Sequence, residues 1–171
     1  MKVEYVSPIG KINIESYNGL IAEVSFINGV KPPPLVKGLT KLNPLASYNA
    51  QFKEVYNDEN VIKECINQLE AYLSGKLKEF KIPLYVSNTP FREGVWKELL
   101  KIPYGETITY KELAKRIGNT AAIRAVGGAN HHNPINIIIP CHRVIGANGK
   151  LTGFAGGLDK KEFLLKLERG E

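Results

Sequence analysis

The sequence predicts a mixed α/β fold of the α+β kind, in which a small antiparallel sheet is followed by a mostly helical part. Three observations predict it. β-Forming residues cluster in the first 27 positions, an apolar stripe with helical spacing follows, and the second half holds two short helical segments separated by a glycine turn. The 171 residues are enough for one large domain or two small ones.

Three strands are expected at the N-terminus, over residues 2–6, 11–16 and 20–27, and Tyr17-Asn18-Gly19 supplies a tight hairpin turn. Prolines at 32–34 and 44 interrupt residues 28–57, so we expect a long surface connection there and assign it no function. A helix capped by Asn57 or Asp58 then runs to Gly75. Its apolar stripe should face the core and consists of Val61, Ile62, Cys65, Ile66, Leu69, Tyr72 and Leu73.

Ser87-Asn88-Thr89-Pro90 marks the expected domain boundary, because this polar run precedes a second helix that begins near Phe91. The predicted domains are therefore 1–86 and 87–171.

A helix-turn-helix is predicted in the second domain. Thr109 can cap a helix over 110–117, Gly118-Asn119 forms the turn, and a second helix spans 121–129. The second helix is built almost entirely of small residues, and Arg124 is its only long polar side chain. Small residues allow either close packing between helices or close approach to a nucleic-acid backbone or minor groove.

Cys141 is the leading candidate for a reactive group. The apolar run 135–139 predicts a short buried strand that ends just before Cys141, and His142 and Arg143 follow it. Neighbouring cationic side chains can lower a thiol pKa from about 8.5 and so favour a thiolate nucleophile. The alternative is a buried and inert cysteine, which is the interpretation that we favour for Cys65.

Composition narrows the class of protein. The formal charge of +6, from 23 Lys and Arg against 17 Asp and Glu, suits a polyanionic partner but also an ordinary basic protein. The first domain contains one cysteine, Cys65, and no histidine, since the first histidine of the chain is His131. Neither a disulfide framework nor a zinc site is therefore expected. No membrane-length apolar run or signal pattern is present, so a cytoplasmic protein is expected.

Four motifs together resemble the O6-alkylguanine-DNA alkyltransferase family, the methylated-DNA–protein-cysteine methyltransferases. They are Pro-Tyr-Gly-Glu-Thr-Ile-Thr-Tyr at 103–110, Arg-Ala-Val-Gly-Gly-Ala at 124–129, Ile-Pro-Cys-His-Arg-Val at 139–144, and the glycine-rich 149–158 with the helical segment after it. The resemblance is ungapped from Thr89 to Glu168 and looser before that. It implies a ribonuclease-H-like first domain and a winged-helix-like second domain.

The resemblance also implies the chemistry. Cys141 would take the alkyl group from guanine O6, or from O4-alkylthymine as an alternative substrate, in a single irreversible turnover. His142 would accept the thiol proton through a water, and Glu168 would orient the imidazole. Tyr110 would donate a proton to N3 of the leaving guanine. Judged on their residue types alone, Tyr110 is a helix residue packed on the core and Glu168 a solvated helix-end charge.

The matching arginine of the family, Arg124, would replace the flipped base in the DNA stack. The remaining DNA contacts would come from the second helix and the residue that caps the first, namely Ala125, Gly127, Gly128, Thr109 and Tyr110. The substrate pocket would be formed by Val144, Ala155, Asn133 and Lys161, with Asn133 bracing the loop and Lys161 at the rim. Phe154 and Ala155 stand where many relatives have tyrosine and serine, so a hydroxyl contact to the ligand is missing.

The expected partner is double-stranded alkylated DNA, bound without sequence preference by a monomer that needs no cofactor and no metal. Three alternatives remain. A lesion-binding protein without transfer activity is disfavoured by Cys141, and a gene regulator by a second helix with little to read bases. A cysteine hydrolase is disfavoured because no glycine elbow is evident.

Overall fold

The computed structural model describes residues 1–35 and 43–171. The N-terminal part is an antiparallel meander in the order β1-β2-β3, formed by Lys2–Ser7, Gly10–Tyr17 and Leu20–Phe26. Asn18 and Gly19 turn the chain between β2 and β3 with φ of 51° and 73°. Such a turn requires positive φ at both positions, which explains why Asn-Gly occupies it. The three predicted strands are confirmed.

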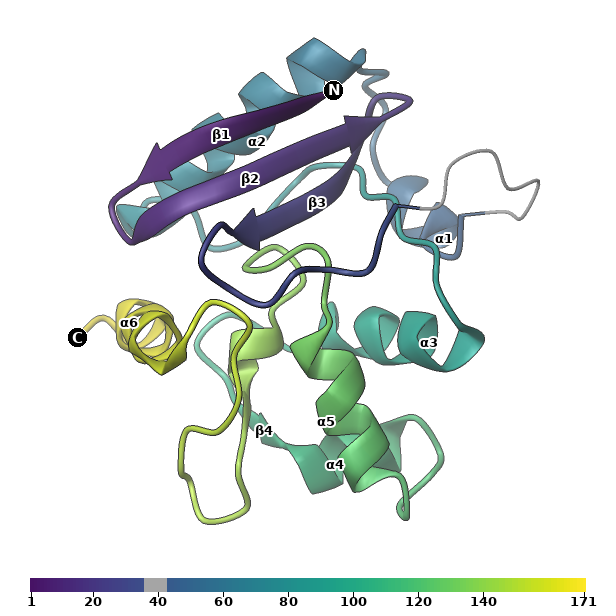
Figure 1. The fold of residues 1–171 in the computed structure, drawn as a ribbon, viewed down its shortest axis with the longest axis vertical. Helices are drawn as coiled ribbons and strands as arrows, with labels where there is room; N and C mark the ends of the chain where they lie inside the picture. The colour runs from purple at the N-terminus through teal and green to yellow at the C-terminus, as the bar shows by residue number, and fades with distance from the viewer. Residues whose placement is uncertain (36–42) are drawn as a thin grey trace.

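Helix α2, Asp58–Leu73, covers one face of this sheet (Figure 1). The Asn57 side chain accepts a hydrogen bond from the Asn60 N–H at 2.7 Å and so begins the helix, and Gly75 follows its end with φ of 75°. The predicted apolar stripe faces the core, and its half-buried member Ile66 packs against the core as well. Cys65 is buried within it, as expected.

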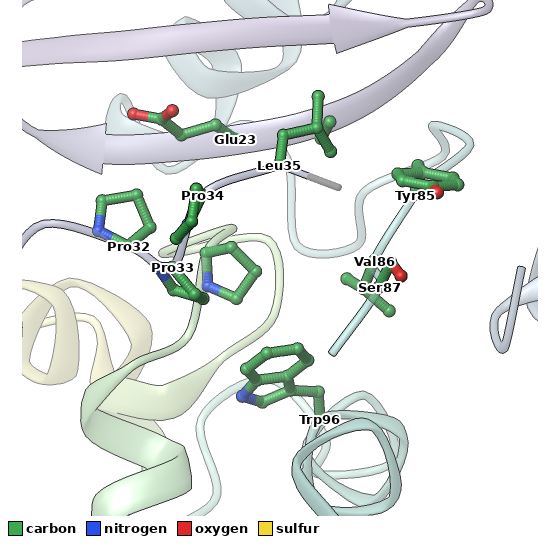
Figure 2. A pocket seen from close by; sticks show the side chains of 11 residues that line it. Glu23, Pro32, Pro33, Pro34, Leu35, Tyr85, Val86, Ser87 and Trp96 are labelled. Carbon is green, nitrogen blue, oxygen red and sulfur yellow. The ribbon is translucent and has the colours of Figure 1, made fainter. Parts of the chain in front are cut away.

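The connection after β3 is only partly the surface loop that was predicted. It contains a short helix, α1 (Ala46–Asn49), and Leu45 is buried. Pro32, Pro33 and Pro34 border a small cavity between β3 and Trp96 (Figure 2). The predicted connection also includes 36–42, which lie outside the described residues.

The free edge of β3 is extended by two later segments. Ile21 exchanges hydrogen bonds with the chain at Pro83 and Tyr85, and Val24 does the same with Pro134 and Asn136, at 2.7–3.0 Å. Unpaired edge N–H and C=O groups are thus satisfied by the chain itself. This pairing joins the sheet to the segment that precedes Cys141.

The helical part lies beside the β3 edge (Figure 1). It contains α3 (Pro90–Leu99), α4 (Tyr110–Arg116), α5 (Ile123–His131) and α6 (Leu158–Arg169), with two short parallel strands, β4 (Ile108–Thr109) and β5 (Val144–Ile145). One continuous apolar core runs through both parts.

The helix-turn-helix prediction is confirmed by α4 and α5. Thr109 caps α4 by accepting a hydrogen bond from the Glu112 N–H at 3.1 Å. Helix α5 begins two residues later than predicted and continues to His131. No side chain caps its N-terminus at Ala122, so the local sequence gives no sharp start.

Candidate active site

Cys141 lies in a short 3-10 helix, η1 (Cys141–Arg143), and only 1% of it is exposed. The Asn130 side chain, from α5, donates to the Cys141 carbonyl at 3.2 Å. The Cys141 Sγ donates to Asn136 Oδ1 at 3.8 Å. The thiol is therefore held between α5 and the segment paired with β3.

The strand predicted over 135–139 is wrong. Ile135 makes one bridge to Val24, and Ile137 then reverses the chain with φ of 73°, so that the Ile139 N–H donates to the Ile135 carbonyl at 3.0 Å. The Asn133 side chain closes this turn by accepting from Ile135 N–H at 3.0 Å and donating to Ile139 O at 2.8 Å. A β-branched residue at positive φ is unfavourable, and the buried amide hydrogen bonds around the turn offset the cost. Asn133 thus braces the loop, as the resemblance implies.

His142 is fully buried and its Nε2 lies 2.8 Å from Glu168 Oε1. A carboxylate accepts only, so Nε2 carries the proton and Nδ1 is left with its lone pair. Among the described residues Nδ1 has no hydrogen-bond partner. Burial lowers the pKa of His142, although Glu168 acts in the opposite direction. A neutral imidazole with a free acceptor nitrogen can serve as a base.

Glu168 is not the solvated helix-end charge that its residue type indicates. Its carboxylate is buried and accepts from Arg143 Nη2 at 2.8 Å, from Arg143 Nε at 3.0 and 3.1 Å, and from the Gly105 N–H at 3.1 Å. Tyr72 of α2 also donates its hydroxyl to Oε1 at 2.5 Å. Burial acts to raise the pKa of Glu168, but the hydrogen bonds from His142 and Arg143 outweigh it and hold that pKa well below its usual range.

The prediction of a lowered thiol pKa is wrong for the resting protein. Burial raises the pKa of Cys141 to about 11, against smaller opposite effects of the Asn133 amide and the Lys161 ammonium. The two neighbours in sequence act elsewhere, because the neutral His142 imidazole and the Arg143 guanidinium are both directed at Glu168. The thiol is therefore protonated at rest and requires a base.

Lys161 is fully buried. Its ammonium donates to the carbonyls of Val144 at 2.6 Å, Thr152 at 2.9 Å and Gly153 at 3.3 Å. Burial lowers the pKa of Lys161 to about 8. The lysine therefore connects β5, at Val144, to the loop that follows this strand.

Tyr110 is half-buried at the start of α4, and its hydroxyl donates to the Thr152 carbonyl at 2.9 Å. The Lys161 ammonium lies 5.8 Å from the centre of the ring. Burial raises the pKa of Tyr110, so its phenol keeps its proton. Tyr110 and Lys161 thus both contact the loop at Thr152.

Ala129 of α5 is buried in the core, but the small residues on the outer face of this helix are not explained by internal packing. A Cβ added at Gly128 would meet nothing within 4 Å, and one at Gly127 would make only ordinary contact with the Tyr110 ring. Ala125 and Arg124 are exposed. Of the two interpretations, this surface favours close approach by a partner over close helix packing.

Ala155 lies in the loop before α6, and its carbonyl accepts from the Val30 N–H at 2.8 Å. A Cβ added at Gly29 would come within 2.3 Å of that carbonyl oxygen, so only glycine fits this approach. Phe26 and Phe154 meet edge to face at 6.1 Å. The N-terminal part therefore supports the loop that carries Ala155.

Sequence reasoning missed four residues of this arrangement: Tyr72, Arg143, Asn130 and Asn136. Tyr72 was assigned to the core stripe and Arg143 only to the environment of the thiol. A signal existed, since a phenol or guanidinium in a buried segment needs a polar partner. The partner itself, Glu168, is remote in sequence and could not be identified from that signal.

In the part of the chain that the structure describes, no group of three or more His, Cys, Asp or Glu side chains could hold a metal ion. Within the same residues, no helix is both long and apolar enough to span a bilayer.

Comparisons with known proteins identify relatives of this chain. Residues 4–86 match the ribonuclease-like domain of 6-O-methylguanine DNA methyltransferase, and residues 90–170 match its DNA-binding domain. The methylated-DNA–protein-cysteine methyltransferase of Methanosarcina acetivorans is 49% identical over 96% of this chain and 95% of its own. That of Methanosarcina mazei is 64% identical over 65% of this chain and 70% of its own.

A solved structure is also similar over nearly the whole fold. The crystal structure of Mycobacterium tuberculosis OGT in complex with DNA superposes with a TM-score of 0.78 and 39% identity, covering 98% of this chain and 91% of that one. The mixed fold with a small N-terminal sheet and a helical C-terminal part is shared. The chain belongs to the 6-O-methylguanine DNA methyltransferase family.

Proposed function

We propose that this protein repairs DNA by direct reversal, moving the alkyl group of O6-alkylguanine irreversibly onto Cys141. The observation that carries the proposal is the buried thiol next to a neutral imidazole, whose Nδ1 has no partner among the described residues while its Nε2 is bound to Glu168. A thiol that is protonated at rest avoids off-target alkylation, and the adjacent base activates it when substrate is bound.

The Cys141 thiol gives its proton to His142 Nδ1 through a water, and Sγ forms a bond to the alkyl carbon as the bond from that carbon to guanine O6 breaks. Tyr110 gives its proton to guanine N3, so neutral guanine leaves. The imidazolium then returns a proton to the phenolate. The net result is a thioether and an unmodified base, with no cofactor consumed.

Val144 and Ala155 are the proposed walls of the pocket for the flipped base, by backbone contacts. Asn130 Oδ1, a second buried acceptor without a partner among the described residues, lies on the side chain that binds the Cys141 carbonyl. Unpaired buried acceptors are unusual and often mark a place that substrate or water occupies. O4-alkylthymine presents a similar alkyl ether and is the proposed second substrate.

Helix α5 is the proposed contact to duplex DNA, with Arg124 filling the space of the extruded base. The exposed Ala125 and the open surface at Gly127 and Gly128 permit close approach to the minor groove. Thr109 fixes the start of α4 beside it. Contacts of this kind read no bases, so binding would be independent of sequence. We also propose that the protein acts as a cytoplasmic monomer with domains 1–86 and 87–171.

The decisive experiment is incubation with duplex DNA that contains one O6-methylguanine, followed by intact-mass measurement and peptide mapping. One methyl group on Cys141 and no further turnover after one equivalent are expected, since a thioether is not a leaving group at neutral pH. Repeated turnover, or methyl on Cys65, would contradict the proposal.

Cys141→Ala is the control that separates transfer from binding. It should abolish transfer while duplex affinity stays within about twofold, because the thiol is small and buried. A loss of binding as large as the loss of transfer would show that Cys141 is a structural residue.

A further inference from the structure

A phenol from the N-terminal helix reaches the charged pair of the active site. Tyr72 lies near the end of α2 and is fully buried. Its hydroxyl donates to Glu168 Oε1 at 2.5 Å and lies 3.3 Å from His142 Nε2. We propose that Tyr72 is a positioning residue for alkyl transfer, whose hydroxyl fixes the Glu168 carboxylate and shares the charge that this carboxylate presents to His142. The inference deepens the proposed function and rests on it.

The direction of this hydrogen bond is fixed by its partners. An ionised carboxylate only accepts, so the Tyr72 hydroxyl keeps its proton and donates it in a hydrogen bond to Glu168 Oε1. Burial raises the pKa of Tyr72, and the neighbouring Glu168 raises it further, so the phenol stays protonated. Arg143 acts in the opposite direction and Tyr104 adds to the rise. The donor is therefore permanent at any pH at which the protein works.

Glu168 Oε1 is shared by three side chains, from Tyr72, His142 and Arg143. Each hydrogen bond that this oxygen accepts reduces the negative charge that is available to its other donors. Without the phenol, the carboxylate would attract the imidazolium of His142 more strongly, and the imidazole would be protonated at a higher pH. The other charged groups that act on His142 are Arg143 and Lys161, and both oppose its protonation.

The hydroxyl can be removed without removing the ring. The Tyr72 ring packs against Phe80 at 5.0 Å and against Tyr104 edge to face at 6.0 Å. Tyr72→Phe keeps these contacts and loses only the donor. Tyr104→Phe is the matched control, because its hydroxyl donates to the Leu167 carbonyl at 3.4 Å and not to the carboxylate.

The test is the single-turnover rate of transfer from free O6-benzylguanine as a function of pH, which involves no DNA binding. Tyr72→Phe should slow transfer roughly tenfold at neutral pH, the effect of losing a hydrogen bond to a charged group. The acid limb of its profile should move up by roughly one pH unit. Tyr104→Phe should change neither. A fluorinated tyrosine at position 72, a stronger donor, should move the acid limb to lower pH.

Each result decides the inference. A Tyr72→Phe profile that matches the native one, or a slower rate with an unmoved acid limb, would assign Tyr72 a packing role only. An equal loss of transfer rate in Tyr104→Phe would also assign Tyr72 a packing role only. If Tyr72→Phe fails to fold, the fluorinated protein alone decides, because an unshifted acid limb there overturns the inference. Failure of the native protein to alkylate Cys141 would instead refute the proposed function.

Discussion

Glu168→Gln should destabilise the protein far more than an ordinary change at the end of a helix. The glutamine has nearly the same shape but no charge, and it leaves the buried Arg143 guanidinium without its carboxylate. The side chains of Glu168 and Arg143 are only 1% and 9% exposed, so water cannot replace the lost partner. Breaking one half of a buried ion pair costs about 3–5 kcal/mol. For a chain of this size each kcal/mol lowers the melting temperature by about 2–4 °C, so a fall of about 6–20 °C is expected.

The assay is thermal and urea unfolding at pH 7, with two comparison proteins. Glu162→Gln, on the same helix, breaks an exposed pair with Lys166 and should change stability by less than about 0.5 kcal/mol. Arg143→Met in the Glu168→Gln background removes the stranded cation and should recover part of the loss, because replacing both halves of a buried pair is often close to neutral.

Acidification gives an independent test of the same reasoning. The folded pKa of Glu168 is depressed, so its stabilisation is present above its unfolded value of about 4.3 and is lost as the pH falls toward the folded value. The difference in unfolding free energy between native protein and Glu168→Gln should therefore shrink below about pH 4. A Glu168→Gln protein within about 1 kcal/mol of native at pH 7, or a double variant no more stable than the single one, would refute the buried-pair argument.

Three further outcomes are expected. Arg124→Ala should slow repair of duplex DNA at least roughly tenfold, since base extrusion costs a few kcal/mol, but leave reaction with free O6-benzylguanine nearly unchanged; equal losses would make Arg124 a pocket or structural residue. Tyr110→Phe should slow both reactions about 100-fold, because general acid catalysis acts on the base itself, and an unchanged rate with the free base would remove that role. Methylation of Cys141 should lower the melting temperature by roughly 2–12 °C and speed amide exchange over 133–144, since overpacking a buried site costs about 1–3 kcal/mol; coincident melting curves would show that the site accepts the adduct without strain.

The elements that sequence predicted well are those set by local chemistry. The Asn18-Gly19 turn, the Asn57 cap of α2 and the Thr109 cap of α4 each depend on residues within four positions of one another. The apolar spacing of α2 reported the face that it buries. These signals do not depend on distant parts of the chain.

The strand prediction for 135–139 failed because contacts with distant parts of the chain determine the structure of this run. Four isoleucines favour a strand by composition, yet Asn133 and Asn136 satisfy the backbone instead, and Asn136 donates to the Val24 carbonyl at 3.0 Å. Propensity for β structure is a weak preference that specific hydrogen bonds override. The buried amides were visible in the sequence, but the strand edge that they meet lies more than 100 residues earlier.

The prediction of a lowered pKa for the Cys141 thiol failed for a related reason. Two basic residues, His142 and Arg143, follow Cys141 directly, but adjacency in sequence is not contact with the thiol. In the 3-10 turn, their side chains reach Glu168 instead, and burial sets the pKa of the thiol. The proposed base, His142, therefore follows Cys141 in sequence without making it a thiolate in the resting protein.

The two halves of the chain are joined by hydrogen bonds at the candidate active site. Tyr72 donates to Glu168, Val30 donates to the Ala155 carbonyl, and both donors belong to the N-terminal part. The first contact acts on the carboxylate that binds the proposed base, His142, and the second acts on the proposed pocket wall. Because hydrogen bonds to buried groups are costly to break, separating the halves would disturb both functions together. The N-terminal part is therefore a working component of the site that the second half carries, and a C-terminal fragment would have a rearranged carboxylate as well as a smaller core.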